Sequence, residues 1–432
     1  MTSDFIKRVP RSIAIFGASS HIGGPMARWL RFHAPHVRLR LIGSTPDKVE
    51  RLRDEFPDLD CVQANYLDLP SLESALEGIE GLFVVTQTVK EAPAMSNLVA
   101  AIRKAGCLIH MVRIVGLQPD MNPRRIPQAM RDYGMGLEIQ HPIARQVLDD
   151  AGMPVTYFNI GASFMDNYLR MATALQETGV LTWTDRSVPY IDPREVGEAA
   201  ARILLSDDAR NVHQFYTLNN GQPAMRAAEV AQLMSDVFLR PIRHDGSKEG
   251  FLAIFEPLVA QGLMPAPVPE YLWNMFQYEE ANAPVWVANQ FLERTLGRQP
   301  NTLRSWLQEH RRYFFDDDTP APRSAGAPAA GVDGTWDCVV STPVGKEPHE
   351  LVVRSAADGS LHGEMTNVKN GLSMTLQDGR HQHGALTWRM QLVKPMKINL
   401  KVAVTVSGDE LSGHATAGMI GKIAIRGVRR SR

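Results

Sequence analysis

The chain contains 432 residues, 44% of them hydrophobic, which is enough for about two to three domains with cores of their own. With a formal net charge of -1 and a pI near 6.9, the chain has no excess of positive charge that would attract a polyanion, so we expect no nucleic-acid partner. Three scattered cysteines without CxxC spacing predict neither disulfides nor a zinc site, and no signal-peptide pattern or run of ~20 apolar residues stands out, which predicts a cytoplasmic protein with no membrane partner.

The most informative stretch begins with a strand predicted at 12–16, which runs directly into residues 17–24, reading GASSHIGG. Gly17 permits a tight strand-to-helix turn, and a glycine at 23 or 24 lets the following helix pack closely on the strand. The N–H groups of that helix's first turn would then face a phosphate anion. The loop therefore predicts a site for the pyrophosphate of a dinucleotide, although Ser20 or His21 fills the middle position of the usual glycine pattern.

Between residues 13 and 158, short β-branched apolar runs alternate with helical patterns. Such alternation predicts an α/β fold with a doubly wound parallel sheet. Beyond residue 159 the pattern is mixed, and helices are predicted at 196–204, 227–238 and 302–315. The strands of the sheet are predicted at 12–16, 37–42, 61–64, 82–86, 108–115 and 154–159, with helical segments between them that include 71–76 and 95–104.

The composition changes abruptly after these helices. Residues 316–333 are rich in Pro, Ala and Gly, which predicts a semi-extended linker. Residues 334–432 contain alternating runs separated by turn signals such as Asp378-Gly379, which predict an antiparallel all-β domain of roughly eight strands, a barrel or a sandwich. Whether it holds an apolar ligand or serves as an assembly surface stays open. His381 and His383 share one strand face, but exposed turn positions explain them better than a metal site.

Several phrases in a fixed order carry a resemblance to a known family. Together they make residues 12–315 resemble the NmrA-like branch of the atypical short-chain dehydrogenase/reductases. The resemblance implies a Rossmann-type domain over residues 1–315 with a smaller substrate-facing region at about 160–300, and NADP(H) as the cofactor. Besides the phosphate loop, the phrases are LPSLESALEG at 69–78, FVVT at 83–86, AGMPVTYFN at 151–159, SFMDN at 163–167, LGRQPNT at 296–302, and Trp306-Leu307.

The end of the second predicted strand favours NADP(H) over NAD(H). No acidic residue stands where NAD-binding relatives hold the ribose hydroxyls, but the family's usual basic residue is also missing. Ser44, Thr45 and Lys48 would meet a 2′-phosphate less strongly than a guanidinium does, so NAD(H) remains the alternative. At the family positions that flank the adenine stand Asn65 and Tyr66, and Tyr66 is equally well explained as a core aromatic. The predicted cofactor-binding residues are Gly17, Ser19, Ser20, His21, Ile22, Gly23, Ser44, Thr45, Lys48, Asn65, Tyr66, Thr86 and Gln87.

The catalytic groups of typical short-chain reductases are not found. Those enzymes use a Tyr-x-x-x-Lys pair with a nearby Ser, whereas this chain has Ile114 near the Ser position and His141 near that of Lys. His141 is the candidate replacement acid, because imidazole titrates near neutral pH, or a ligand of the nicotinamide ribose; an exposed helix-cap residue is the plainer interpretation. Arg113 stands where open α/β sheets bind ligands, with a structural salt bridge as its alternative role.

These features predict an NADP(H)-dependent oxidoreductase that reduces a small, largely apolar conjugated or carbonyl substrate, such as an enone, a quinone or an aromatic ketone. Phe164, Asp166, Asn167 and Tyr168 are expected to line its pocket, as the matching family positions do, and no metal site is predicted. Two alternatives belong to other classes: a non-catalytic NADP(H) sensor that binds a protein partner, and a lyase or isomerase on the same fold. Assembly into a homo-oligomer is left open.

Overall fold

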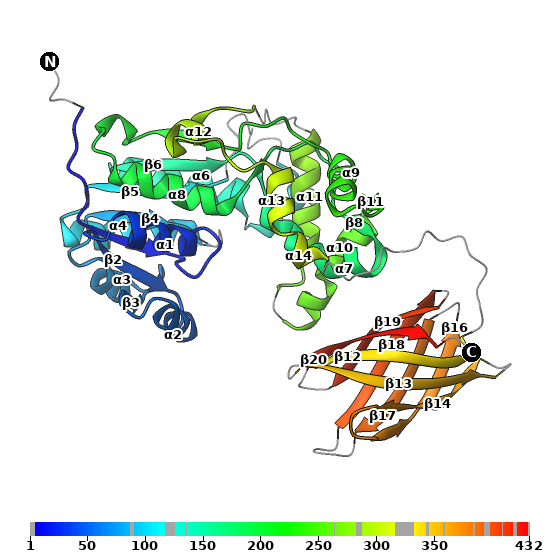
Figure 1. The fold of residues 1–432 in the computed structure, drawn as a ribbon. Coiled ribbons are helices and arrows are strands. Elements are labelled where there is room, and N and C mark those ends of the chain that lie inside the picture. Colours follow the sequence, from blue (N-terminus) through cyan, green and yellow to red (C-terminus); the bar gives the residue numbers. More distant parts are fainter. Residues whose placement is uncertain are drawn as a thin grey trace. The chain divides into compact units, whose positions relative to one another are not determined.

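A computed structural model describes two compact units, Met1–Thr319 and Pro320–Arg432, and each has hydrophobic cores of its own (Figure 1). The first unit is α/β and the second is all-β. Among the described residues, no helix is both long and apolar enough to cross a membrane. The described residues are 5–86, 90–116, 126–134, 136–262, 264–281, 287–315, 332–342, 345–356, 359–382, 385–392, 398–407, 409–417 and 421–430.

A seven-stranded parallel sheet forms the centre of the first unit. The residues of β1, β4 and β5 are all buried, as expected for a parallel sheet covered on both faces. The strand order reverses between β1 and β4, and ligands of such sheets bind beyond the carboxyl ends of the strands at that point. In spatial order the strands are β10 (Phe215–Leu218), β6 (Val155–Ile160), β5 (His110–Val115), β4 (Gly81–Val84), β1 (Ser12–Phe16), β2 (Arg38–Gly43) and β3 (Asp60–Gln63).

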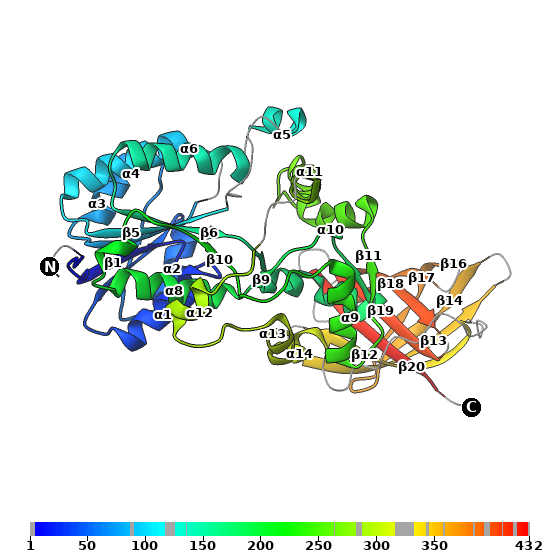
Figure 2. The ribbon, with the colours of Figure 1, turned by 90° about the horizontal axis from the view of Figure 1, so that it is seen from above.

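Helices cover both faces of this sheet, which confirms the predicted doubly wound architecture (Figure 2). One face packs against α1 (Gly23–His33), α2 (Pro46–Glu55), α8 (Pro193–Leu205) and α12 (Phe291–Leu296). The other packs against α3 (Leu69–Leu76), α4 (Glu91–Ala105) and α6 (Leu137–Asp150). The six predicted strands occur within two residues of their expected ends. The edge strand β10 was not predicted, because its run of four residues is too short to show a clear alternating pattern.

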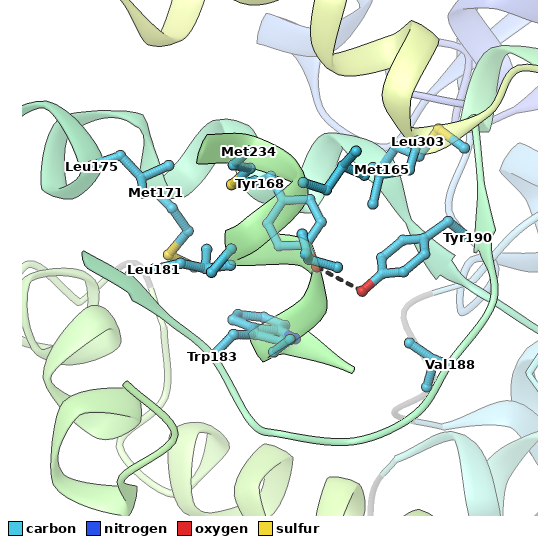
Figure 3. Packing of buried hydrophobic residues seen from close by; sticks show 14 of the residues in the cluster. Met165, Tyr168, Met171, Leu175, Leu181, Trp183, Val188, Tyr190, Met234 and Leu303 are labelled. Carbon is cyan, nitrogen blue, oxygen red and sulfur yellow. Dashed lines mark hydrogen bonds between the residues drawn. The ribbon is translucent and has the colours of Figure 1, made fainter. Parts of the chain in front are cut away.

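A further hydrophobic core, separate from those on the two faces of the sheet, lies in the part of the same unit that was expected to face a substrate. Figure 3 shows part of it, with the hydroxyl groups of Tyr168 and Tyr190 hydrogen-bonded among methionine and leucine side chains. The helical stretch predicted at 302–315 is two helices that meet at His310. The elements of this part are α5 (Gln128–Tyr133), β7 (Ser163–Phe164), a 3-10 helix (Met165–Met171), α7 (Ala172–Thr178), β8 (Val180–Thr182), β9 (Tyr190–Ile191), α9 (Ala227–Phe238), β11 (Arg243–Asp245), α10 (Lys248–Ala260), α11 (Val268–Ala281), α13 (Leu303–Glu309) and α14 (Arg311–Phe314). A 3-10 turn (Ala209–Asn211) lies instead beside the start of β6, where the Asn211 carbonyl accepts the hydroxyl of Thr156.

The second unit is a closed antiparallel barrel of eight strands. It closes because β13 pairs with β14 as well as with β12, so the alternative of a sandwich is wrong. Alternate side chains such as Trp336, Leu351 and Ile425 fill the interior. Residues 316–331 of the predicted linker, and His383, lie outside the described residues. The strands are β12 (Gly334–Thr342), β13 (Gly345–Ser355), β14 (Ser360–Asn367), β16 (Gln377–Gln382), β17 (Ala385–Leu392), β18 (Ile398–Ser407), β19 (Glu410–Ala417) and β20 (Gly421–Arg429), with the short β15 (Ser373–Thr375) added beside β14.

Because the hydrophobic cores of the two units are separate, a substitution that destabilises the barrel should not destabilise the first unit. Trp336 is fully buried, and Trp336→Ala should destabilise that unit by about 3–5 kcal/mol. Hydrogen exchange followed by mass spectrometry should show faster exchange in barrel peptides and unchanged exchange in residues 5–315. Val339→Ala, at a position on the same strand whose side chain is exposed, is the matched control and should change neither unit. Faster exchange in the sheet of the first unit would contradict this separation.

Candidate active site

The loop between β1 and α1 has a compact geometry that fits a pyrophosphate. A Cβ at Gly23 would lie 2.3 Å from the carbonyl oxygen of Gly17, so only glycine lets α1 begin this close to β1. The backbone N–H groups of Ile22 and Gly23 donate to the Ser20 hydroxyl at 3.4 and 3.1 Å. This hydroxyl provides the acceptor that a phosphate oxygen would provide at a helix N-terminus. Ser19 and His21 are exposed on the same loop.

The end of β2 offers a cation and two hydroxyl groups. The Lys48 ammonium donates to the Ser44 hydroxyl at 3.0 Å, and Thr45 caps α2 by accepting the N–H of Lys48. Ser44 and Thr45 are exposed, so all three groups can turn toward a ligand without breaking core packing. This arrangement fits a 2′-phosphate, which needs positive charge and hydrogen-bond donors.

Tyr66, at the neighbouring strand end, is half-buried and packs against the hydrophobic core. Its ring stacks on Phe16 with 4.5 Å between centroids, and its hydroxyl donates to the carbonyl of Val85 at 3.1 Å. Burial raises the pKa of this hydroxyl well above its usual range. Asn65 is exposed beside it and accepts the N–H of Leu67 at 2.9 Å. Of the two predicted adenine neighbours, Asn65 is therefore the more accessible.

Arg113 is buried in an ion pair, the structural alternative considered for it. Its Nη2 lies 2.9 Å from Oε2 of Glu91, and the two side chains are 0% and 1% exposed. Thr86 joins the same network, because its hydroxyl donates to Glu91 and accepts from Arg113 at 3.3 Å. Arg113 is thus held away from solvent, where it positions the start of α4 against the end of β5. Gln87, which follows Thr86 and was predicted to bind the cofactor, lies outside the described residues.

His141 lies on α6 and its ring is tied to the end of β5. The N–H of Gly116 donates to His141 Nδ1 at 2.8 Å, so the proton of the neutral imidazole is on Nε2. Burial, together with the charge of Arg113, lowers the pKa of the ring to about 3. With 7% of its surface exposed, His141 is not the exposed helix-cap residue that the plainer interpretation described. It is instead a buried, uncharged hydrogen-bond donor at the carboxyl edge of the sheet.

The segment after β6 reaches the phosphate loop. Asp166 Oδ2 lies 2.6 Å from His21 Nδ1, and Phe164 packs edge-on against the same imidazole at 4.8 Å. Two of the four predicted substrate residues therefore lie beside the predicted cofactor loop. The next residue in the chain, Asn167, is half-buried. Tyr168 is 3% exposed and belongs to the core, where its hydroxyl forms a hydrogen bond of 2.7 Å with that of Tyr190.

Sequence reasoning missed two acids at this edge of the sheet. Glu91 was not singled out, because its partnership with Arg113 spans 22 residues of chain. Glu138 was also missed, although it precedes His141 by one helical turn and lies on the buried face of α6. An acid on an otherwise buried helix face is the signal that could have found it. No cluster of three or more metal-ligating side chains occurs in the part of the chain that the structure describes.

The parallel sheet, the glycine loop of its first strand-to-helix turn and the polar groups at its carboxyl edge define a dinucleotide-binding protein of the Rossmann type. More particularly, the chain belongs to the NmrA-like family, whose sequence profile matches residues 10–307. The matched residues cover the first unit and end before the barrel.

Individual relatives also match the first unit. The (4-alkanoyl-5-oxo-2,5-dihydrofuran-3-yl)methyl phosphate reductase of Streptomyces griseus is 28% identical over 304 residues, covering 70% of this chain and 99% of its own. The NAD(P)H azoreductase of Xenophilus azovorans is 27% identical over 252 residues, covering 56% of this chain and 80% of its own. A solved structure of an NADPH-dependent quinone oxidoreductase from Escherichia coli, complexed with NADPH, superposes with a TM-score of 0.57 at 22% identity, covering 69% and 99% of the two chains.

Acid should destabilise the first unit through its buried histidines. Burial lowers the pKa of both His110 and His141 to about 3, so these two rings bind more protons in the unfolded chain than in the folded chain at any pH between about 3 and about 6.5. The free energy of unfolding should therefore fall as the pH drops below about 6.5, by about 1.4 kcal/mol per pH unit for each ring. Denaturant titrations should show a shallower fall for His141→Gln than for the wild type; an identical fall would contradict the assignment.

Proposed function

We propose that the protein is an NADP(H)-dependent oxidoreductase that reduces a small, largely apolar substrate with a conjugated or carbonyl group, such as an enone, a quinone or an aromatic ketone. The observation that carries the proposal is that three groups meet the carboxyl ends of strands in one parallel sheet: the phosphate loop follows β1, the Ser44–Lys48 pair follows β2, and His141 is hydrogen-bonded to Gly116 just after β5. The names of the relatives, both of them reductases and one an NAD(P)H enzyme, support it. When bound, NADPH supplies a hydride to the acceptor.

His141 would orient the acceptor or the nicotinamide ribose by hydrogen bonding. Its pKa of about 3 leaves the ring uncharged near neutral pH, so the Nε2–H group donates a hydrogen bond without giving up its proton. The Gly116 N–H on Nδ1 holds the ring in one tautomer. This role differs from that of the lysine of typical short-chain reductases, because His141 adds no positive charge beside a phenol.

The test is consumption of NADPH by the purified full-length protein with a panel of enones, quinones and aromatic ketones. We expect turnover of at least one of these classes, and binding of NADPH measured separately by its fluorescence. Binding without turnover across the panel would favour the sensor and overturn the oxidoreductase. Conversion of a substrate with no change in NADPH would favour a lyase or isomerase. If His141→Ala keeps full turnover, the residue has no part in the mechanism.

Cofactor preference should depend on Lys48. Lys48→Ala removes the cation beside Ser44, and we expect the Kd for NADPH to rise about tenfold, the loss of one charge-assisted hydrogen bond, while that for NADH stays unchanged. Arg51→Ala is the matched control, because it removes one positive charge from the same helix at a side chain that bonds the Asp47 carbonyl. Equal weakening of both cofactors by Lys48→Ala would contradict a 2′-phosphate site at the end of β2.

A further inference from the structure

A buried acid that the proposed chemistry has not yet used lies at the same edge of the sheet. We propose that Glu138, held in place by Tyr271, is the catalytic acid that gives its proton to the reduced substrate. This inference rests on the proposed function, because a proton is needed only where an acceptor such as an enone takes up a hydride. It goes further by assigning the group that replaces the missing tyrosine.

The placement of Glu138 follows from the direction of α6. The helix connects the carboxyl end of β5 to the start of the parallel strand β6, so its first turn lies at the carboxyl edge, where open α/β sheets bind ligands. Residues three apart share a helix face, and His141 on this face is tied to Gly116, just beyond β5. Glu138 therefore lies one turn farther out from the sheet than His141, toward the substrate-facing part of the unit.

The carboxyl group of Glu138 is buried but only half satisfied. It is 2% exposed; Oε2 accepts the hydroxyl of Tyr271 at 2.6 Å, while Oε1 is buried with no hydrogen-bond partner among the described residues. A buried acceptor without a partner costs about 1–3 kcal/mol. The side-chain oxygen of a glutamine could accept the same hydrogen bond from Tyr271 and link α6 to α11. This link alone therefore does not explain why an acid stands at position 138. When Oε1 is protonated, its O–H group has no acceptor among the described residues, so it is available to a bound substrate.

The chain also makes room for the tyrosine that holds this acid. A Cβ at Gly136 would lie 2.2 Å from the Tyr271 hydroxyl oxygen, so only glycine at that position allows the hydroxyl to reach Glu138. Tyr133 stacks on the Tyr271 ring with 4.8 Å between centroids and fixes its orientation. The hydrogen bond between Tyr271 and Glu138 thus depends on three elements: α5 carries Tyr133, α6 carries Glu138 and α11 carries Tyr271.

The surroundings keep Glu138 protonated in much of the population near neutral pH. The pKa of its carboxyl is raised to about 7, mainly by burial; the negative charge of Glu279 acts in the same direction, and the hydrogen bond from Tyr271 opposes both. Glu279 is itself paired with Arg186. Among the described residues, Tyr133 beside Tyr271 and His141 on the same face of α6 carry no charge near neutral pH. After donation, the carboxylate keeps the Tyr271 hydrogen bond and lies in the first turn of α6, where the helix dipole favours an anion.

For an enone, the hydride that bound NADPH would supply adds to the β-carbon before the proton is transferred. A C–H bond of the reduced nicotinamide would break and one at the β-carbon would form, the C=C π electrons would move to give an enolate, and NADPH would be oxidised to NADP⁺. The enolate takes the proton from Glu138, the O–H bond of the acid breaks, and Glu138 remains as a carboxylate. Water returns the proton before the next turnover.

The first test is the pH dependence of turnover with whichever panel substrate the wild type reduces. Wild-type kcat should fall as the pH rises through about 7, because the acid loses its proton, and Glu138→Gln should lower kcat about 100-fold and abolish that fall. Tyr271→Phe removes the hydrogen bond that lowers this pKa, so the fall should move to higher pH. Tyr133→Phe, which keeps the stacked ring and leaves the Glu138 hydrogen bond intact, is the matched control and should not move it.

The second test needs no turnover. An infrared difference spectrum between the wild type and Glu138→Gln should show the C=O band of a protonated carboxyl that disappears as the pH rises through about 7. If this band is absent at acidic pH, or if Glu138→Gln keeps the wild-type kcat and pH profile, the inference is overturned while the proposed reductase stands. A wild type that binds NADPH but reduces nothing in the panel overturns the proposed function itself.

Discussion

The candidate site depends on one buried ion pair, between Arg113 on β5 and Glu91 at the start of α4. Its Nη2–Oε2 distance is 2.9 Å and neither side chain reaches solvent. Removing one partner of such a pair leaves an unpaired buried charge and typically costs about 3–5 kcal/mol. Thr86, just after β4, contacts both partners, and the Glu91 N–H donates to the side chain of Gln140 on α6 at 3.1 Å. The pair therefore joins two strands to the two helices that frame the carboxyl edge.

The positions of the chemical groups on α6 follow from this anchor. Gln140 also donates to the carbonyl of Gly134 at 2.7 Å, which fixes the chain just before the helix begins. His141, the next residue, then reaches the Gly116 N–H at the end of β5, and Glu138 comes one turn earlier against Tyr271. These contacts, made by Glu138, Gln140 and His141 in the first five residues of α6, thus derive from a helix start that the ion pair and its neighbours hold in place.

The parts of this architecture that could be predicted from the sequence are those with local signals. The phosphate loop and the alternating strands are encoded within a few residues, so their positions follow from spacing alone. Partnerships across the chain have no such signal: Tyr271 lies 133 residues from Glu138, and Tyr168 was expected in a pocket but meets Tyr190 in the core. The closure of the barrel could not be predicted for the same reason. The pairing of β13 with β14 closes it, but the alternation of inward and outward side chains in these strands is the same in a barrel and in a sandwich.

Charge balance connects these observations to the kind of substrate that the site suits. The buried arginines of the first unit are matched by carboxylates, Arg113 by Glu91 and Arg186 by Glu279, so each pair cancels its own field. Burial leaves His141 uncharged and keeps Glu138 protonated in much of the population near pH 7. A surface of this kind offers hydrogen bonds without a fixed countercharge, and it would not repay the dehydration of an ionised substrate. It agrees with the uncharged, conjugated acceptor that we propose, whose negative charge would develop only after hydride transfer, when an acid is needed to remove it.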